Sequence, residues 1–204
     1  PADCSRVLFL DSDIALLRDA RDLWKTDLQG YPLGAVSDAY LDPSTFQERW
    51  GLEPGGAYFN AGVLLIDLDA VRAGRIFSRA IAFIAEHDQE LPYHDQDALN
   101  WAFWKNWLPL APIWNVQRHM AMLEIVREIP ESRRLNGRLP ALVHYLGAEK
   151  PWHKKTWHPW AWAFGRGTAR IPFLREVSQK NGVTGLMRFR MWLRRGPAQT
   201  AKLL

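Results

Sequence analysis

The chain alternates short apolar runs, one of which contains a histidine, with longer segments of mixed polarity. Four runs have the length of a β-strand, at residues 7–10, 33–36, 63–66 and 141–147. Unbroken apolar runs of this kind are typical of strands buried in a sheet, and the first is predicted to be buried on both faces. Mixed with helical segments, these runs predict an α/β layered domain.

The segments between the runs predict helices and turns. Asp69 can cap a helix over residues 70–86, whose apolar side chains recur at helical spacing and predict core packing. A second helix is expected after residues 95–97, where acidic side chains complement the helix dipole. We further expect a helical turn at 19–28, a loop or broken helix at 43–56, and a strand at 114–115.

Two carboxylates follow the first apolar run. Asp11 and Asp13 are separated by one residue, so on an extended chain their side chains point to the same side. There they either repel each other or share a hard divalent cation such as Mg²⁺ or Mn²⁺, which prefers oxygen ligands and suits a phosphate-bearing substrate. The alternative is that Asp11 caps a helix and Asp13 is a solvated charge.

Polar or small residues also flank the second and third runs. Asp38 follows the second run, where it can face the same cleft as Asp11 or simply begin a loop. Asn60, Ala61 and Gly62 precede the third run. Their small side chains allow a ligand to approach the backbone, although Gly62 could also relieve a crowded strand crossing.

His144 lies inside the fourth run. A single histidine in an apolar strand is usually a hydrogen-bonded core residue rather than a metal ligand. Here Gly147 and Lys150 follow it, and a glycine and a lysine at these offsets can wrap a phosphate, through backbone donors and a point charge respectively.

Composition narrows the possible functions. The 204 residues suffice for one domain with a substantial core, and the single cysteine, Cys4, excludes an internal disulfide and fits a reducing compartment. No apolar run reaches the length that spans a bilayer. The net charge is +4, but the part up to Glu176 is slightly acidic because the last 28 residues carry six basic and no acidic side chains: Lys180, Arg188, Arg190, Arg194, Arg195 and Lys202.

This basic tail indicates a local anionic partner rather than a nucleic acid. One hypothesis is peripheral attachment to an anionic membrane surface. The other is an ordinary solvated extension.

Four segments in a fixed order make the pattern more specific. They are Phe-Leu-Asp-Ser-Asp at 9–13, Tyr-Phe-Asn-Ala-Gly-Val at 58–63, His-Asp-Gln-Asp-Ala-Leu-Asn at 94–100 and His-Tyr-Leu-Gly-Ala-Glu-Lys-Pro-Trp at 144–152. Together they resemble the family-8 glycosyltransferases, which include bacterial lipopolysaccharide galactosyl- and glucosyltransferases and glycogenin. The resemblance covers about residues 5–155.

This resemblance implies the GT-A nucleotide-sugar transferase fold, a Rossmann-like mixed sheet flanked by helices. Residues 1–155 would form the catalytic domain and 156–204 an aromatic, basic extension. In the family, a strand–helix–strand portion precedes the Asp-x-Asp strand and supplies much of the uracil and ribose pocket. Because these residues lack it, we expect little or no transfer activity and poor solubility from them alone.

The resemblance also implies roles for single residues. Asp11, Asp13 and His144 would hold Mn²⁺ or Mg²⁺, and Gln96 and Asp95 would be the catalytic candidates. The donor, UDP-glucose or UDP-galactose, would be bound by Asp11, Ser12, Asp38, Asn60, Ala61, Asp95, Gln96, Gly147 and Lys150.

The implied reaction is retaining transfer of a hexose to a saccharide or lipid-linked saccharide acceptor, in lipopolysaccharide or other cell-surface glycan synthesis. The cytoplasm, or the cytoplasmic face of the inner membrane, is the expected location. Gln96 is a poor nucleophile, so we favour attack by the acceptor from the face that UDP leaves, with Asp95 as the alternative nucleophile.

Two rival hypotheses remain at this point. A haloacid-dehalogenase-type phosphatase also begins with an apolar strand and Asp-x-Asp, but such enzymes expect Thr or Val where this chain has Ala15. A catalytically inert carbohydrate-binding fragment would use the eleven tryptophans as stacking surfaces for sugars.

Overall fold

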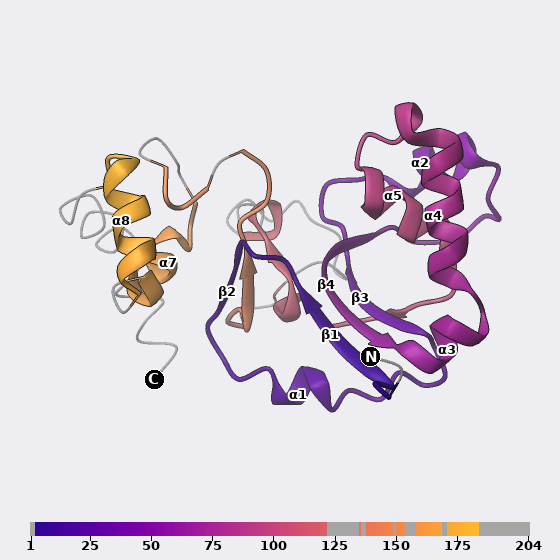
Figure 1. Ribbon diagram of the computed structural model, residues 1–204, viewed down its shortest axis with the longest axis horizontal. Coiled ribbons are helices and arrows are strands. Elements are labelled where there is room, and N and C mark those ends of the chain that lie inside the picture. The colour runs from indigo at the N-terminus through magenta and orange to yellow at the C-terminus, as the bar shows by residue number, and fades with distance from the viewer. Residues whose placement is uncertain are drawn as a thin grey trace. The chain divides into compact units, whose positions relative to one another are not determined.

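The computed structural model describes residues 3–121, 135, 138–148, 150–153, 158–168 and 171–183 (Figure 1). The chain divides into two compact units. The first unit comprises Pro1–Asp11 and Ala20–Ala111, and the second comprises Ser12–Asp19 and Pro112–Leu204. Each unit contains its own sheet.

The first unit is built on a four-stranded mixed sheet in the order β1-β4-β3-β5. Strands β1 and β3 run antiparallel to the central β4, and β5 runs parallel to β3. A register shift between Ala35 and Val36 interrupts the β3–β4 pairing. The strands are β1 (Arg6–Leu10), β3 (Leu33–Ser37), β4 (Phe59–Asp67) and β5 (Leu108–Pro109).

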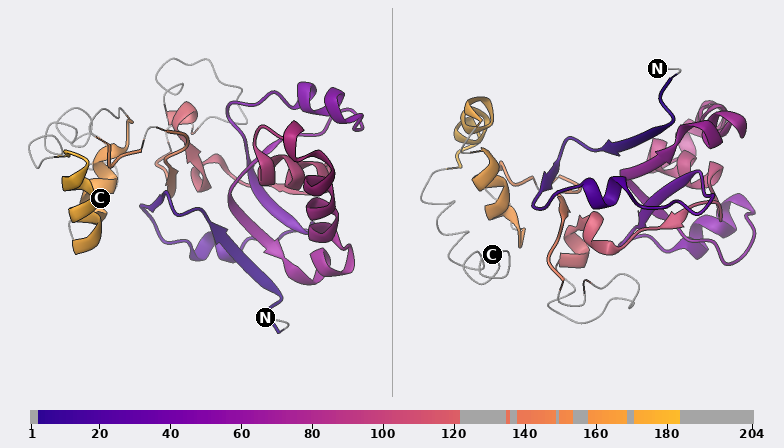
Figure 2. Two further views of the ribbon diagram at one scale, coloured as in Figure 1. Left: turned by 45° about the horizontal axis from the view of Figure 1, so that its top comes forward. Right: turned by 90° about the horizontal axis from the view of Figure 1, so that it is seen from below.

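Helices complete the first unit, and its hydrophobic core lies between them and the sheet. The inward residues of β3 and β4 pack with α3, α4 and α5, and the Phe83 and Trp101 rings stack 4.3 Å apart. The helices α4 and α5 lie side by side in both ribbon views (Figure 1, Figure 2). The helical elements are α1 (Arg21–Trp24), α2 (Pro43–Trp50), α3 (Leu68–Ala73), α4 (Ile76–His87), η1 (Asp88–Glu90) and α5 (His94–Ala102).

The second unit contains a three-stranded sheet in the order β2-β7-β6. Strand β2 runs antiparallel to β7, and β6 runs parallel to it. Tyr145 follows β7 and packs edge-on against His158 and Phe164. The elements are β2 (Ile14–Leu16), η2 (Pro112–Trp114), β6 (Val116–Gln117), β7 (Leu142–His144), α7 (Ala161–Thr168) and α8 (Pro172–Lys180).

The α/β fold class is confirmed, but two details of the pattern were misinterpreted. Strand β1 is not buried on both faces: Phe9 is 44% exposed, because among the described strands β1 pairs with β4 alone and so forms an edge. The single helix expected over 70–86 is two helices, since Arg75 adopts a left-handed backbone (φ 48°) between α3 and α4.

Three smaller expectations also changed. The strand expected at 114–115 was wrong, because a 3₁₀ turn ends at Trp114 and the strand begins at Val116. The segment 43–56 contains a regular helix, α2, which begins after Asp42 because the Asp42 carboxylate accepts a hydrogen bond from the Ser44 amide. Asp11 is not a helix cap, since strand β2 follows.

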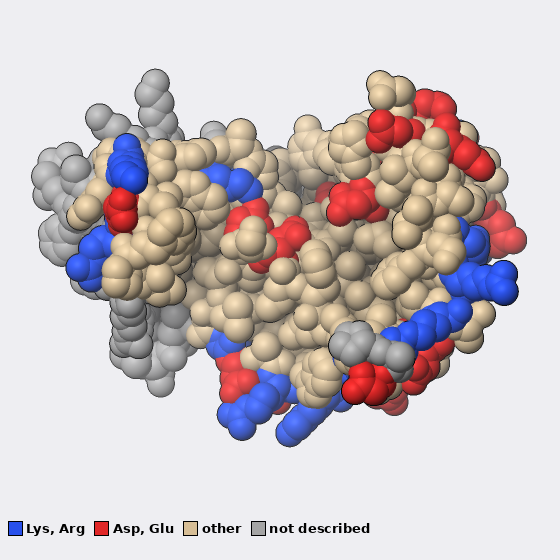
Figure 3. All heavy atoms as spheres, in the orientation of Figure 1, with Lys and Arg blue, Asp and Glu red and all other residues tan. Residues whose placement is uncertain are grey.

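Several expectations lie outside the described residues. The predicted boundary at 155 falls within 154–157, and most of the basic tail lies in 184–204. Within the described segments, no helix is both long and apolar enough to cross a bilayer. Acidic and basic side chains are interspersed on the face shown in Figure 3.

Candidate functional site

Three residues that were predicted to bind a metal come together. One ligand atom from each of Asp11, Asp13 and His144 lies within 4.8 Å of the others; we call these residues the ion cluster. Asp11 directly follows β1, where its amide donates to the Gly62 carbonyl at 2.9 Å. Asp13 precedes β2, and its carbonyl accepts from the Tyr145 amide at 3.1 Å, next to His144 at the end of β7.

Asp13 is the electrostatic centre of the ion cluster. Its Oδ2 forms an ion pair with the Lys150 ammonium, and its Oδ1 lies 3.1 Å from His144 Nε2. Burial raises the pKa of Asp13, but hydrogen bonds and charge from His144 and Lys150 outweigh it and lower that pKa to about 2. Asp13 is therefore ionised throughout the physiological pH range.

The orientation of His144 determines what Asp13 meets. The buried His144 ring places Nδ1 3.1 Å from Asn115 Oδ1, an acceptor, so Nδ1 carries the proton in the neutral ring. The lone pair of Nε2 then faces Asp13 Oδ1, a buried oxygen for which the described residues provide no hydrogen-bond donor. In this neutral form two acceptors face each other, and a divalent metal bound by both would satisfy them, so the donor set fits such a metal. Without a metal, a second proton on the His144 ring forms the hydrogen bond that lowers the pKa of Asp13.

Gly147 and Lys150 lie in the loop that follows β7. Gly147 is exposed and has a left-handed backbone (φ 73°), which reverses the chain at little cost in a glycine. This turn brings Lys150 back, so that its Nζ donates to the Tyr145 carbonyl at 2.8 Å as well as to Asp13. The lysine expected to contact a diphosphate thus lies beside the ion cluster.

A second group of predicted residues is joined by hydrogen bonds in the first unit. Gln96 Oε1 accepts from the Ala61 amide at 3.0 Å and from Asn60 Nδ2 at 3.1 Å. Asn60 Nδ2 also lies 3.2 Å from Asp38 Oδ2, and Gln96 Nε2 lies 3.4 Å from the same oxygen. Asp38, Asn60, Ala61 and Gln96, which are distant in sequence, thus form one connected set.

Three further residues complete this set. Tyr58 Oη donates to Asp97 Oδ1 at 2.6 Å. Asn100 accepts from the Phe59 amide at 2.7 Å and donates to the Phe59 and Gln96 carbonyls at 2.8 and 2.9 Å, which fixes α5 to β4. We call the whole set the amide network: Asp38, Tyr58, Asn60, Ala61, Gln96, Asp97 and Asn100.

Besides Gly147, two predicted site residues are exposed. Asp95 lies in the first turn of α5 and Ser12 lies between β1 and β2. Neither side chain forms a hydrogen bond within the described part of the chain, so no described residue fixes either of them in this way. Asp97, interpreted from sequence as a charge favourable to the helix dipole, is instead buried against Tyr58.

Sequence reasoning gave no role to Tyr58, Asn100 or Asn115. All three are buried and act through partners that are 29 to 41 positions away. Tyr58 and Asn100 lie inside the family motifs at 58–63 and 94–100, and this position could have indicated a functional role. Asn115 had no such signal, because its partner is known only once β6 and β7 are paired.

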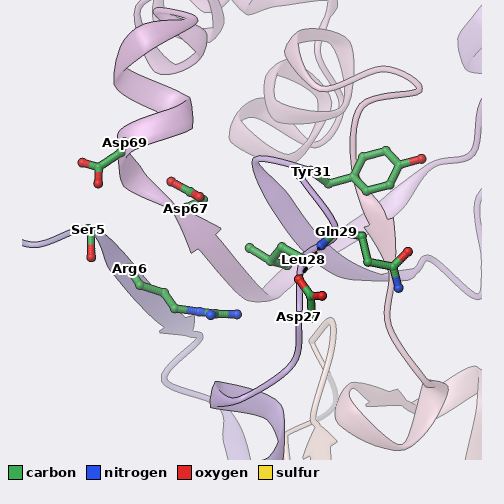
Figure 4. A pocket seen from close by; sticks show the side chains of 9 residues that line it. Ser5, Arg6, Asp27, Leu28, Gln29, Tyr31, Asp67 and Asp69 are labelled. Atoms are coloured by element: carbon green, nitrogen blue, oxygen red, sulfur yellow. Dashed lines mark hydrogen bonds between the residues drawn. The ribbon is translucent and has the colours of Figure 1, made fainter.

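A separate pocket of about 250 Å³ lies in the first unit (Figure 4). Asp67 and Asp69 line it at the junction of β4 and α3, together with Asp27 and Arg6. The carboxylates already have structural partners, since Asp67 caps α3, Asp27 accepts from the Gln29 amide, and Asp69 pairs with Arg72. None of the predicted site residues lines this pocket.

Comparison with known proteins gives a consistent family assignment. The glycosyl transferase family 8 model matches residues 2–156. General stress protein A of Bacillus subtilis is 36% identical over 160 residues, which cover 76% of this chain and 55% of that protein. Lipopolysaccharide 1,2-glucosyltransferase of Escherichia coli is 27% identical, over 76% of this chain and 46% of that protein.

Solved structures agree in fold. Galactosyltransferase LgtC, solved in complex with donor and acceptor sugar analogues, matches with a TM-score of 0.69 and 28% identity over 88% of this chain and 63% of that chain. The chain spans about half the length of the curated relatives it matches. The glycosyl transferase family 8 model covers three quarters of the chain. This match does not support the rival hypothesis of a haloacid-dehalogenase-type phosphatase.

The ordered motifs, the mixed sheet and the family match all lead to one assignment. The chain belongs to glycosyltransferase family 8.

Proposed function

We propose that the protein is a retaining hexosyltransferase that takes UDP-glucose or UDP-galactose as donor and depends on Mn²⁺, or on Mg²⁺. The observation that carries the proposal is the ion cluster, in which Asp13 Oδ1 and His144 Nε2 face each other at 3.1 Å as two acceptors. Asp11 supplies a further carboxylate. A cation held there would neutralise charge on the departing UDP.

Lys150 and Gly147 would bind the diphosphate. Lys150 is paired with Asp13, and its ammonium can turn from that carboxylate to a phosphate oxygen. Gly147 leaves the loop open on its outer side, because no atom lies within 4 Å of where a Cβ would be. A phosphate could therefore approach the backbone amides of this turn.

The amide network would bind the hexose. Asp38 and Asn60 are buried polar groups, and such groups recognise sugar hydroxyls by hydrogen bonds of fixed direction. Gln96 Oε1 already accepts two hydrogen bonds, from Ala61 and Asn60. Both lone pairs are thus engaged, which weakens Gln96 as a nucleophile.

This engagement favours attack by the acceptor hydroxyl on the face that UDP leaves. The bond between the acceptor oxygen and C1 forms as the bond between C1 and the UDP oxygen breaks, and the hydroxyl proton passes to the departing phosphate. The products are a glycoside of retained configuration and UDP. A glycosyl adduct trapped on Asp95, the exposed carboxylate beside Gln96, would overturn this mechanism.

The acceptor is proposed to be a saccharide or lipid-linked saccharide of lipopolysaccharide or another cell-surface glycan. The support is similarity to a lipopolysaccharide 1,2-glucosyltransferase. We propose a site of action on the cytoplasmic face of the inner membrane, with the basic tail on anionic lipid. If deletion of residues 184–204 left liposome sedimentation unchanged, the membrane contact would be refuted.

The test is donor hydrolysis and transfer by the natural gene product that contains this chain, using a panel of UDP-hexoses with Mn²⁺ or EDTA. We expect UDP release from one UDP-hexose with Mn²⁺ and none with EDTA. Asp13→Asn should abolish turnover, whereas Asp22→Asn, an exposed acid in α1, should not change it. Release of phosphate from an aryl phosphate, with no turnover of any UDP-hexose, would contradict the proposal.

A further inference from the structure

Tyr58 and Asp97 form a buried polar pair beside the residues proposed to bind the hexose. Tyr58 is 1% exposed and Asp97 is 3% exposed, and neither has a role in the reaction described above. We propose that Tyr58 and Asp97 are positioning residues, which hold the side-chain amide of Gln96 in one orientation for the bound hexose. This inference rests on the proposed function and adds two residues to it.

The first step is the orientation of the Gln96 amide. The Ala61 amide can only donate a hydrogen bond to Gln96. The Asn60 side chain also donates to Gln96, through Nδ2, because its Oδ1 accepts from the Gly62 amide at 3.1 Å. Both donors meet the same end of Gln96, which must therefore be its oxygen. The Nε2 end is then directed away from the Ala61 amide.

The second step is what Nε2 meets. It lies 3.4 Å from Tyr58 Oη and 3.4 Å from Asp38 Oδ2. A tyrosine hydroxyl accepts from Gln96 without conflict only when its own proton points elsewhere. The 2.6 Å hydrogen bond to Asp97 Oδ1 directs that proton away from Gln96.

The third step is the fixation of Asp97 itself. Its Oδ2 accepts from the Tyr93 amide at 2.8 Å, so both carboxylate oxygens are engaged. Burial and the Asp97 charge raise the pKa of Tyr58 above its ordinary value, which keeps the phenol protonated as the donor. The hydrogen bonds thus run in one direction, from Gln96 to Tyr58 and from Tyr58 to Asp97.

Substitution of Tyr58 or Asp97 should weaken the contact that holds the Nε2 end of the Gln96 side-chain amide. In Tyr58→Phe, Nε2 retains only the 3.4 Å contact to Asp38. In Asp97→Asn, the side-chain nitrogen of the new asparagine faces either the Tyr93 amide or the Tyr58 hydroxyl, so two donors face each other and one hydrogen bond is lost. Because binding of metal and diphosphate is assigned to other residues, the loss should lower kcat and leave the Kd for UDP nearly unchanged.

The first measurement needs no substrate. In the natural gene product labelled with ¹⁵N-glutamine, the Gln96 side-chain signals are identified by their absence in Gln96→Glu. We expect Tyr58→Phe and Asp97→Asn to accelerate exchange of these amide protons about tenfold. Trp107→Phe is the matched control: it removes a buried donor to the Ala57 carbonyl, next to Tyr58, and should leave the exchange unchanged.

The second measurement is donor hydrolysis by the natural gene product. Tyr58→Phe should lower kcat about tenfold, with the Kd for UDP within about twofold, and the double variant should be no worse than Asp97→Asn alone. Unchanged exchange, or faster exchange with unchanged kcat, would overturn the positioning role. Faster exchange in both variants of a protein that turns over no UDP-hexose would support the orientation of Gln96 and refute the proposed function.

Discussion

In the amide network donors face acceptors, whereas in the ion cluster two acceptors face each other. Gln96 Oε1 meets the Ala61 amide at 3.0 Å, but Asp13 Oδ1 meets His144 Nε2 with no hydrogen between them in the neutral ring. The network is complete without a ligand and is therefore preorganised. The ion cluster needs a positive charge, either a second proton on the His144 ring or a metal ion. Metal should therefore stabilise the ion cluster and leave the amide network unchanged, whereas loss of an internal hydrogen bond should weaken the amide network.

The largest predicted effect is on metal binding by the ion cluster. Asp13→Asn removes the carboxylate that faces both His144 and Lys150, and the affinity for Mn²⁺ should fall at least about 100-fold. Calorimetric titration of the natural gene product that contains this chain with Mn²⁺ measures this change. Asp22→Asn should bind as the wild type does, and equal loss in both variants would mean that the charge acts non-specifically.

The next effect tests the amide network as a structural unit. Asn100→Ala leaves the buried main chain of Phe59 without its side-chain partners, so the free energy of unfolding should fall by about 3 kcal/mol. Urea unfolding measures this change. Asn181→Ala loses one exposed hydrogen bond to the Val177 carbonyl and should change it by less than about 0.5 kcal/mol. A similar small change in Asn100→Ala would contradict the network's role.

A pH effect distinguishes the second unit from the first. Burial, and then the charge of Arg118, lower the pKa of His158 to about 3. Between pH 6.5 and 3 the unfolded state binds a proton that the folded state does not, so stability falls on acidification, by about 1.4 kcal/mol per pH unit at most.

Urea unfolding at pH 6.5 and pH 5 measures this dependence. In the wild type the loss should be about 2 kcal/mol. His158→Asn retains an acceptor for the Trp160 amide but does not titrate, so its loss should be smaller by that amount. An identical pH dependence in both proteins would show that His158 does not control it.

The smallest predicted effect concerns the residue that orients His144. Asn115→Ala removes the acceptor for Nδ1 and leaves every predicted metal ligand in place. The affinity for Mn²⁺ should fall about tenfold. Asn106→Ala, an exposed residue after α5, should have no effect. If Asn115→Ala also left the affinity for Mn²⁺ unchanged, contacts other than the one to Asn115 would orient the His144 ring.

Much of the fold could be predicted because apolar runs are local signals. The runs at 33–36 and 63–66 became β3 and β4, since strands buried beneath helices need no polar alternation. The break between α3 and α4 could not be predicted from periodicity, because apolar spacing continues across Gly74 and Arg75. The exposure of Phe9 depends on which strands flank β1, and a single run does not reveal that.

The candidate site divides in the same way. Asp11, Asp13 and His144 could be grouped because their types and order match a family, and the structure brings their ligand atoms together. Asn115 could not be found, because it matters only through a buried partner that the fold brings near. Tyr58 lies inside a motif, but its pairing with Asp97 becomes visible only in the fold. Tyrosine and asparagine are common hydrogen-bonding residues, so their presence in a sequence does not indicate which buried partner they have.

The most direct test of the account is electron paramagnetic resonance of Mn²⁺ bound to the natural gene product that contains this chain, labelled with ¹⁵N-histidine. If the ion cluster holds the metal, the spectrum should show hyperfine coupling to one imidazole nitrogen, and His144→Gln should abolish this coupling while His94→Gln, which changes an exposed histidine, retains it. Bound Mn²⁺ without nitrogen coupling, or with coupling that survives in His144→Gln, would contradict the assignment of this cluster as the metal site.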